Sequence, residues 1–355
     1  MENNTMPTID SETDSHWMSL ALEQARQGVG FTSPNPAVGA VIVSGGEMIG
    51  QGYHRKAGQP HAEIEALRDA QKRAPDQIAG ATIYVTLEPC STQGRTGACT
   101  VAIQSAGIQR VVWGADDPNP AHAGRAQELL EAVGVTVTRG VLREACEDLL
   151  RPFAKWITTG LPYVIAKAGQ SLDGRITRPA GEGQWITSEA ARAHSQGLRA
   201  RVDAILIGAE TLRRDNPRLT LRNGSLKEQP WRVVLTRGGD LPAESRLFTD
   251  EHQMRTLVLR DLSFKDALKA LAAQGITSVL VEGGANVLGQ AFREHCVDEV
   301  CWYIAPRLCG AGLPVLAGPE WAQSVALDKV SILPIGDNVC IAGLPVWPNF
   351  ESVIE

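Results

Sequence analysis

The sequence predicts an α/β protein of two domains, and three observations support this prediction. Segments with strand and helix patterns alternate along the chain, and this alternation stops at a Gly- and Pro-containing segment, residues 158–162, before it restarts. The 355 residues are also enough for two domains of ordinary size. We therefore expect one domain over residues 16–158 and a second over residues 159–355. Residues 1–15 are polar, acidic and without periodicity, so we expect a disordered tail there.

The first half of the chain alternates short apolar runs with amphipathic stretches. Apolar residues at helical spacing after Trp17 are typical of a helix, and the Ser-Gly-Gly turn at residues 44–46 is typical of a hairpin. We expect helices over residues 17–28, 61–73, 100–106, 127–132 and 142–156. We expect strands over residues 37–43, 48–53, 81–87, 108–114 and 135–138.

The second half repeats this alternation without any internal repeat of the first. Ser188 precedes an amphipathic stretch and is expected to cap it, because a serine hydroxyl can accept a hydrogen bond from a backbone N–H group in the first helical turn. We expect strands over residues 163–168, 202–208, 232–236, 256–259, 276–281 and 299–304. We expect helices over residues 188–200, 263–274 and 287–295.

The most informative motif of the first half is His61-Ala62-Glu63, followed by Cys90 and then by Cys99. One imidazole and two thiolates supply three zinc ligands, and a catalytic zinc keeps its fourth position for water. Bound zinc lowers the pKa of that water to about 7. Glu63 is well placed to move the proton of the water to the ring nitrogen and to the leaving ammonia, as in zinc deaminases. The motif predicts a zinc-dependent deaminase of a nucleobase-like ring.

Two other interpretations of this motif remain open. Cytidine-type deaminases space their cysteines as Cys-x-x-Cys, whereas eight residues separate Cys90 from Cys99. The intervening segment, residues 91–98, is polar and contains glycine, so it can bring both sulfurs to one metal. The first alternative is a pair of unrelated buried thiols beside a histidine at a helix start. The second is a structural zinc module, although structural zinc normally has four protein ligands.

Composition excludes several other classes of function. The net charge of −6 argues against a general nucleic-acid-binding protein, which would normally have a basic surface. No apolar run approaches the roughly 18 residues that a membrane span needs, and the first residues do not resemble a signal peptide. The seven cysteines are scattered and odd in number, which is typical of a reducing compartment. We expect a cytoplasmic protein.

Motifs in both halves carry a resemblance to one family. They are residues 34–39 (PNPAVG), 52–54 (GYH), 60–63 (PHAE), 86–90 (TLEPC), 94–96 (GRT), 117–120 (DPNP), 171–175 (SLDGR), 184–188 (QWITS) and 281–284 (VEGG). In these motifs, and in the spacing of its two motif cysteines, the chain resembles the bifunctional deaminase/reductase of riboflavin biosynthesis from about Trp17 to its C-terminus.

The resemblance implies a cytidine-deaminase-like three-layer domain followed by a dihydrofolate-reductase-like domain. The first domain would deaminate diaminohydroxyphosphoribosylaminopyrimidine with the help of Zn²⁺. The second would use NADPH to reduce the ribosyl side chain of the aminouracil product to ribityl. The implied partner is therefore a phosphorylated pyrimidine, without nucleic acid or membrane, and the implied assembly is a homo-oligomer, either a dimer or a tetramer.

The resemblance also assigns residues to roles. It makes His61, Cys90 and Cys99 the zinc ligands and Glu63 the catalytic residue. It assigns substrate contacts to Asn35, His54 and Arg95 in the first domain and to Gly183, Arg199, Leu219, Arg222 and Glu282 in the second. It assigns cofactor contacts to Gly169, Trp185, Thr211, Asp215, Arg237, Gly284, Ala285, Asn286, Val287, Leu288, Gly289 and Gln290. Thr92 stands where the family usually has a histidine, and Gly183 where it often has a serine.

Some of these residues also have simpler interpretations. The Gly-Gly pair at residues 283–284 lets a backbone approach a pyrophosphate at a helix start, but alone it is more typical of a plain turn. Arg237 follows an expected strand and either meets the 2′-phosphate of NADPH or is a solvated surface charge. Arg199 either binds the substrate phosphate or is paired within the fold.

Overall fold

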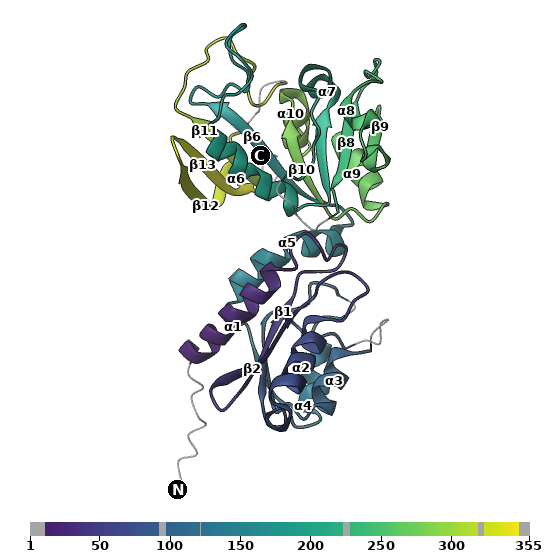
Figure 1. Cartoon of the computed structure of the whole chain (residues 1–355), viewed down its shortest axis with the longest axis vertical. Helices are drawn as coiled ribbons and strands as arrows, with labels where there is room; N and C mark the ends of the chain where they lie inside the picture. Colours follow the sequence, from purple (N-terminus) through teal and green to yellow (C-terminus); the bar gives the residue numbers. More distant parts are fainter. Residues whose placement is uncertain (1–10, 92–96, 121, 223–227, 319–322, 348–355) are drawn as a thin grey trace, which may run out of the picture. The chain divides into compact units, whose positions relative to one another are not determined.

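A computed structural model describes residues 11–91, 97–120, 122–222, 228–318 and 323–347 (Figure 1). The chain divides after Gly160 into two compact units, which is two residues beyond the expected boundary. Each unit has its own sheet and its own buried core. Within each unit, strands and helices alternate, as the sequence predicts.

The first unit is a five-stranded sheet in the order β2-β1-β3-β4-β5. Its strands are β1 (Gly39–Ser44), β2 (Glu47–Tyr53), β3 (Thr82–Leu87), β4 (Arg110–Ala115) and β5 (Thr136–Arg139). Its helices are α1 (Ser11–Arg26), α2 (Ala62–Arg73), α3 (Cys99–Ser105), α4 (Arg125–Glu131) and α5 (Arg143–Thr159), with a 3₁₀ turn at Pro75–Gln77. Strands β3, β4 and β5 are parallel, and β1 is antiparallel to both of its neighbours. Helices α1 and α5 cover one face and α2, α3 and α4 cover the other, which makes the expected three-layer domain (Figure 1).

The expectation of a disordered tail over residues 1–15 is wrong for residues 11–15, which belong to α1. The buried Asp14 explains why: its carboxylate accepts hydrogen bonds from Tyr84 Oη at 2.8 Å and from Arg110 Nη1 at 2.9 Å and Nη2 at 2.6 Å. The polar composition of this segment gave no indication of the ion pair that holds the helix against the sheet. Residues 1–10 lie outside the described residues.

Helix α1 packs closely on the sheet because of a glycine in β1. A Cβ atom at Gly39 would lie 2.1 Å from the carbonyl oxygen of Ala21 and 2.4 Å from the backbone nitrogen of Ala25. Only glycine permits this approach of the helix to the strand.

The second unit is an eight-stranded sheet in the order β12-β13-β11-β6-β10-β7-β8-β9. Its strands are β6 (Tyr163–Ser171), β7 (Ala204–Gly208), β8 (Trp231–Thr236), β9 (Thr256–Arg260), β10 (Ser278–Gly283), β11 (Glu299–Ala305), β12 (Ala326–Ile335) and β13 (Asn338–Val346). Its helices are α6 (Glu189–Ala200), α7 (Ala209–Asp215), α8 (Arg246–Thr249), α9 (Phe264–Ala272) and α10 (Ala285–Arg293), with a 3₁₀ turn at Gln253–Arg255. The strands from β11 to β9 are all parallel, and β12 and β13 form an antiparallel hairpin at one edge.

The sequence did not predict β12, β13, α7 or α8. Most residues of β12 are exposed, so the strand lacks the alternation of buried and exposed positions that marks a half-buried strand. Helices α7 and α8 are too short to display a helical period. Ser188, in contrast, caps α6 as expected, because its hydroxyl accepts a hydrogen bond from the backbone N–H of Ala191.

The strand order of the second unit creates a crevice at one edge of the sheet. After β6 the chain forms β7, β8 and β9 in turn, and β10 then returns between β6 and β7. Helices α6 and α7 contribute to the core on one face of the sheet, and α9 and α10 contribute to the core on the other. In open α/β sheets, ligands bind outside the carboxyl ends of the strands where the strand order reverses. The carboxyl ends of β6, β7, β8 and β10 all lie at that edge.

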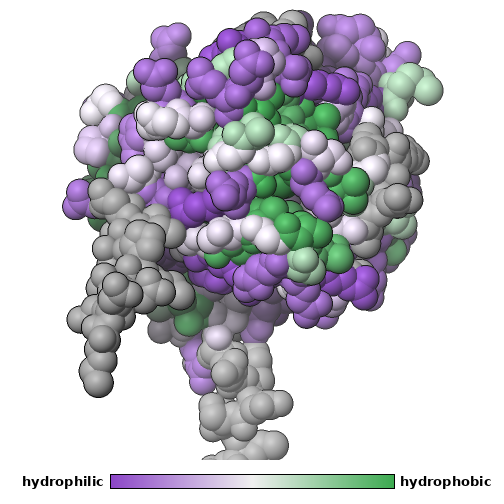
Figure 2. Space-filling view, turned by 90° about the horizontal axis from the view of Figure 1, so that it is seen from below, coloured by the Kyte–Doolittle hydropathy of each residue, from purple (hydrophilic) through white to green (hydrophobic). Residues whose placement is uncertain are grey.

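On the face in Figure 2, hydrophobic residues lie in small groups among hydrophilic ones. Within the described parts of the chain, no helix has both the length and the apolar character that crossing a membrane requires.

Candidate active sites

Three segments of the first unit bring the predicted zinc ligands together. His61 is the residue before α2, Cys90 follows the end of β3, and Cys99 begins α3. The Nδ1 atom of His61 lies 3.5 Å from the sulfur of Cys90 and 3.3 Å from that of Cys99. All three donor atoms lie within 4.8 Å of one another.

These distances fit a tetrahedral zinc ion. With Zn–S and Zn–N bonds of about 2.3 and 2.0 Å, a nitrogen and a sulfur at two corners of a tetrahedron are about 3.5 Å apart. The cluster supplies three donors, and no fourth His, Cys, Asp or Glu joins it among the described residues. Three protein ligands are typical of a catalytic zinc, which keeps one position open.

Hydrogen bonding shifts the pKa values of the two thiols in opposite directions. The bond from Cys99 lowers the pKa of Cys90, while the bond to Cys90 and then burial raise the pKa of Cys99. The backbone N–H of Cys99 also donates to the sulfur of Cys90 at 3.3 Å. Zinc binds cysteine as the thiolate, so zinc binding would release the proton that the raised pKa favours on Cys99.

Glu63 lies in the first turn of α2, two residues after His61. Only 3% of its surface is exposed, and burial, followed by the charge of Cys90, raises the pKa of its carboxyl group. A carboxyl group in such surroundings can take up and release a proton closer to neutral pH than an exposed one can.

The buried His54 and the partly buried Asn35 form a hydrogen-bonded pair beside the metal ligands. The His54 Nδ1 atom lies 3.0 Å from the carbonyl oxygen of Pro60, which can only accept, so Nδ1 carries the proton. The His54 Nε2 atom then accepts from Asn35 Nδ2 at 3.1 Å. Burial lowers the pKa of His54, although the bond to Pro60 opposes this effect. Its ring lies 5.4 Å from that of His61. The other predicted contact, Arg95, lies outside the described residues, as does Thr92.

Sequence reasoning missed the function of Glu88 in this site. Its buried carboxylate accepts hydrogen bonds from the backbone N–H groups of Asp117 at 3.2 Å, Gly124 at 3.1 Å and Ala126 at 3.2 Å. It thereby holds the loop after β4 beside the end of β3, two residues before Cys90. The sequence did contain one indication: Glu88 directly follows a buried apolar run, and a buried carboxylate there needs hydrogen-bond donors.

Two cavities occupy the crevice of the second unit, with volumes of about 930 and 510 Å³. Residues that line both are Lys167, Gln184, Trp185, Thr211, Asp215 and Glu282. The larger cavity is also lined by the predicted residues Gly169, Gly183, Arg237, Gly284, Ala285, Asn286, Val287, Leu288 and Gln290. The smaller cavity is also lined by the predicted residues Arg199, Leu219 and Arg222.

Gly289 differs from the other predicted cofactor residues, because it does not line either cavity. A Cβ atom there would lie 1.9 Å from the carbonyl oxygen of Ala317, so Gly289 lets α10 pack against that segment.

The glycine turn between β10 and α10 forms part of the larger cavity. Gly283 has φ of 138° and Gly284 has φ of 80°, which side chains disfavour. A Cβ atom at Gly284 would also lie 3.0 Å from Thr211 Oγ1. Because of these two glycines, the chain passes directly from the end of the strand into the first turn of α10 at the cavity wall.

Arg199 and Glu282 form a buried ion pair between α6 and β10. The Nε and Nη2 atoms of Arg199 donate to the two carboxylate oxygens at 2.5 and 2.8 Å, and Nη1 donates to the carbonyl oxygen of Thr220 at 3.0 Å. Burial raises the pKa of Glu282, but Arg199, Lys167 and Arg222 outweigh burial and lower it to about 2. Arg199 is therefore paired within the fold and also faces the smaller cavity.

The smaller cavity includes two arginines that sequence reasoning did not select, Arg218 and Arg246. Arg218 lies in the segment of residues 216–222, which contains two predicted substrate contacts. Its position beside them could have indicated a role in the same site. Arg246 belongs to the short helix α8 and had no signal in the sequence.

The fold and these sites define a class of protein: a zinc-site deaminase domain joined to a reductase domain. The family model described as the cytidine and deoxycytidylate deaminase zinc-binding region matches residues 11–115, and the model described as the RibD C-terminal domain matches residues 162–341. The riboflavin biosynthesis protein RibD of Bacillus amyloliquefaciens is 38% identical, over 94% of this chain and 96% of that protein.

Two solved structures are similar to this chain over nearly its whole length. RibD of Acinetobacter baumannii is 35% identical with a TM-score of 0.86, over 95% of this chain and 100% of that one. A diaminohydroxyphosphoribosylaminopyrimidine deaminase/5-amino-6-(5-phosphoribosylamino)uracil reductase of Thermotoga maritima is 33% identical with a TM-score of 0.86, over 95% of this chain and 99% of that one. The chain belongs to the RibD family and is a bifunctional deaminase and reductase of riboflavin biosynthesis.

Proposed function

We propose that the first unit removes an amino group from diaminohydroxyphosphoribosylaminopyrimidine and that the second unit reduces the ribosyl side chain of the product with NADPH. The observation that carries the first step is the cluster of His61, Cys90 and Cys99 beside the buried Glu63. The second step is supported by two adjoining cavities around the glycine turn.

In the deaminase, His61, Cys90 and Cys99 would hold zinc, which supplies an activated water at neutral pH. Glu63 would take one proton from the attacking water and give it to the ring nitrogen. It would then move the second proton, from the hydroxyl group now bonded to the ring carbon, to the amino group, which leaves as ammonia. Its raised pKa suits both transfers, because the carboxyl group must bind and release the proton in one cycle. The neutral His54 holds the Asn35 amide in one orientation, so that Asn35 can contact the substrate ring.

In the reductase, the larger cavity falls within the range of about 300–1,000 Å³ that ligand pockets occupy. Gly284 and the first turn of α10 offer backbone N–H groups to a pyrophosphate. Arg237 is suited to the 2′-phosphate of NADPH, which supplies the hydride when it is bound. The smaller cavity, with Arg199, Leu219, Arg222 and Glu282, would receive the aminouracil and its phosphate.

We also propose a homo-oligomer, either a dimer or a tetramer, and a cytoplasmic location. The assembly rests on the family resemblance. The location rests on the odd number of scattered cysteines and on the zinc thiolates, both of which fit a reducing compartment.

The test follows ammonia release and NADPH oxidation separately, with zinc-loaded protein and the diamino-pyrimidine substrate. We expect ammonia without NADPH, and NADPH oxidation once the cofactor is added. NADPH oxidation only with the deaminated substrate would contradict the deaminase part of the proposal, and Thr92 would be the first residue to examine.

Glu63→Gln provides the sharper test of the catalytic group. We expect ammonia release to fall by at least about a hundredfold, as the loss of a general acid–base requires, while zinc content and NADPH oxidation with deaminated substrate stay unchanged. The matched control is Glu65→Gln, since Glu65 lies in the same helical turn and pairs with Arg68 at 2.9 Å. Normal ammonia release in Glu63→Gln would refute the role of Glu63.

A further inference from the structure

The smaller cavity of the second unit contains more positive than negative side chains. Its basic residues are Lys167, Arg199, Arg218, Arg222 and Arg246, and its acidic residues are Asp215 and Glu282. Glu282 is already paired with Arg199. Within the described part of the chain, Arg218, Arg222 and Arg246 have no carboxylate at ion-pair distance. The cavity therefore offers an anion guanidinium groups that form no close ion pair among the described residues.

A buried ion pair holds two of these arginines in place. Arg232 in β8 is fully buried, and its Nη1 and Nη2 atoms donate to the carboxylate of Asp250 at 2.6 and 2.8 Å. Arg232 also donates to the carbonyl oxygen of Arg218 at 3.2 Å and to that of Leu247, the residue after Arg246, at 2.9 Å. One guanidinium group thus fixes the backbone of both segments.

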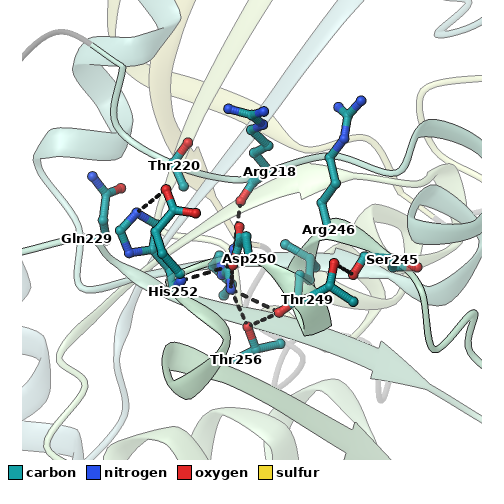
Figure 3. A network of polar contacts seen from close by, with 12 residues as sticks. Arg218, Thr220, Gln229, Ser245, Arg246, Thr249, Asp250, His252 and Thr256 are labelled. Carbon is teal, nitrogen blue, oxygen red and sulfur yellow. Dashed lines mark hydrogen bonds and ion pairs between the residues drawn. The ribbon is translucent and has the colours of Figure 1, made fainter.

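A second contact connects the same two segments directly. The side-chain oxygen of Asn216 accepts a hydrogen bond from the backbone N–H of Arg246 at 2.9 Å. In Figure 3 the side chains of Arg218 and Arg246 extend to the same side, away from the network around Asp250. These hydrogen bonds hold the backbone of both arginines, and both residues line the smaller cavity.

Arginine is suited to phosphate because its planar guanidinium group can donate two parallel hydrogen bonds to two phosphate oxygens. We propose that Arg218 and Arg246 bind the phosphate group of the reductase substrate, and that the Arg232–Asp250 pair positions them for this contact. The proposal rests on the proposed function of the second unit and names the residues that make it selective for a phosphorylated substrate.

The test compares reduction of the phosphorylated aminouracil with reduction of the same compound without its phosphate. For Arg218→Gln and for Arg246→Gln, we expect kcat/KM for the phosphorylated substrate to fall about ten- to a hundredfold, mainly through KM, since a charge-assisted hydrogen bond is lost. The rate with the dephosphorylated substrate should not change. The control is Arg260→Gln at the end of β9, an exposed arginine that lines neither cavity. An equal loss on both substrates, or no loss on either, overturns the proposal.

A binding experiment separates failure of this proposal from failure of the proposed function. Inorganic phosphate, at constant ionic strength adjusted with chloride, should raise the unfolding midpoint of the wild-type protein and of Arg260→Gln, but raise it less in the two cavity variants. If the wild type reduces neither substrate and still responds to phosphate in this way, the proposed reaction fails while the anion site stands. Equal phosphate responses in all four proteins overturn the site.

The positioning role of the buried pair has its own test. Asp250→Asn keeps the shape of the side chain but weakens its bonds to Arg232. We expect a loss of preference for the phosphorylated substrate, with unchanged kcat on the dephosphorylated one. Unchanged preference in a folded Asp250→Asn protein would limit this pair to a structural role and overturn the positioning claim.

Discussion

Glu63 and Glu282 are both buried glutamates, and their surroundings shift their pKa values in opposite directions. Burial dominates at Glu63 and raises its pKa. At Glu282 the cations Arg199, Lys167 and Arg222 outweigh burial, and the pKa falls to about 2. The first carboxyl group therefore binds a proton more readily than an exposed glutamate does, whereas the second stays ionised at neutral pH. The same side chain therefore suits proton transfer in one unit and fixed charge pairing in the other.

The ion pair of Glu282 predicts a pH-dependent loss of stability on substitution. Glu282→Gln leaves Arg199 buried without a counter-charge, so we expect the free energy of unfolding of the second unit to fall by about 3–5 kcal/mol at pH 7. Because the pKa of Glu282 is lowered in the folded state, its contribution is complete above its ordinary pKa of 4.5 and is lost as the pH falls toward about 2. Denaturant unfolding between pH 7 and pH 3.5 should show the difference from wild type shrinking below pH 4.5. Exposed Glu251→Gln is the control, and a difference that does not depend on pH would contradict the charge pairing.

At the scale of elements, two connections support the sites: the contact of α1 with the first sheet and the turn from β10 into α10. Helix α1 is fastened by Asp14 to Arg110 in β4 and to Tyr84 in β3, across the sheet that positions the zinc ligands. The turn from β10 into α10 is formed by two glycines with positive φ at the wall of the larger cavity. Each connection depends on one or two residues, so each can be tested by a single substitution.

Asp14→Asn should destabilise the first unit, because Arg110 and Tyr84 lose their charged acceptor. We expect a loss of about 3–5 kcal/mol, as for other broken buried ion pairs. Glu12→Gln, an exposed position in the same helix, should change the stability by less than about 0.5 kcal/mol. Thermal unfolding monitored by circular dichroism measures both. Equal stability of the two variants would mean that α1 is not anchored through Asp14.

Gly284→Ala should weaken cofactor binding and stability together. The alanine would be held at φ of 80°, and its Cβ atom would lie 3.0 Å from Thr211 Oγ1. We therefore expect the free energy of unfolding of the second unit to fall by about 1–3 kcal/mol. Titration with NADPH should show a higher Kd. Gly197→Ala in α6 is the control, since a Cβ atom there meets no neighbour within 4 Å. Wild-type affinity in Gly284→Ala would remove the turn from the proposed cofactor site.

At the scale of the whole molecule, the chain contains two compact units with separate cores. A ligand that binds only the folded form of one unit stabilises that unit alone. Scanning calorimetry of the full chain should therefore resolve two transitions. Removing zinc with a chelator should lower the midpoint of one, and adding NADPH should raise the midpoint of the other. A single transition that responds to both treatments would show that the units unfold together.

The sequence determined the α/β class, the order of the two domains and the family, because helical and strand periodicity and short motifs are local properties. It also selected the zinc ligands and Glu63, since their chemistry is distinctive and their spacing is short. The roles assigned to the substrate and cofactor residues remain predictions, although most of them within the described ranges line the cavities or the zinc site.

Only the tertiary structure revealed the anchoring of α1, the loop contacts of Glu88 and the positions of Arg218 and Arg246 at the smaller cavity. Asp14 and Arg110 are 96 residues apart in sequence, and Arg218 and Arg246 come from segments separated by a strand. A polar residue in a loop or a short helix has no periodicity that marks it as buried or functional. Its partner is chosen by the packing of the sheet, which brings distant segments together, and a linear pattern does not contain that information.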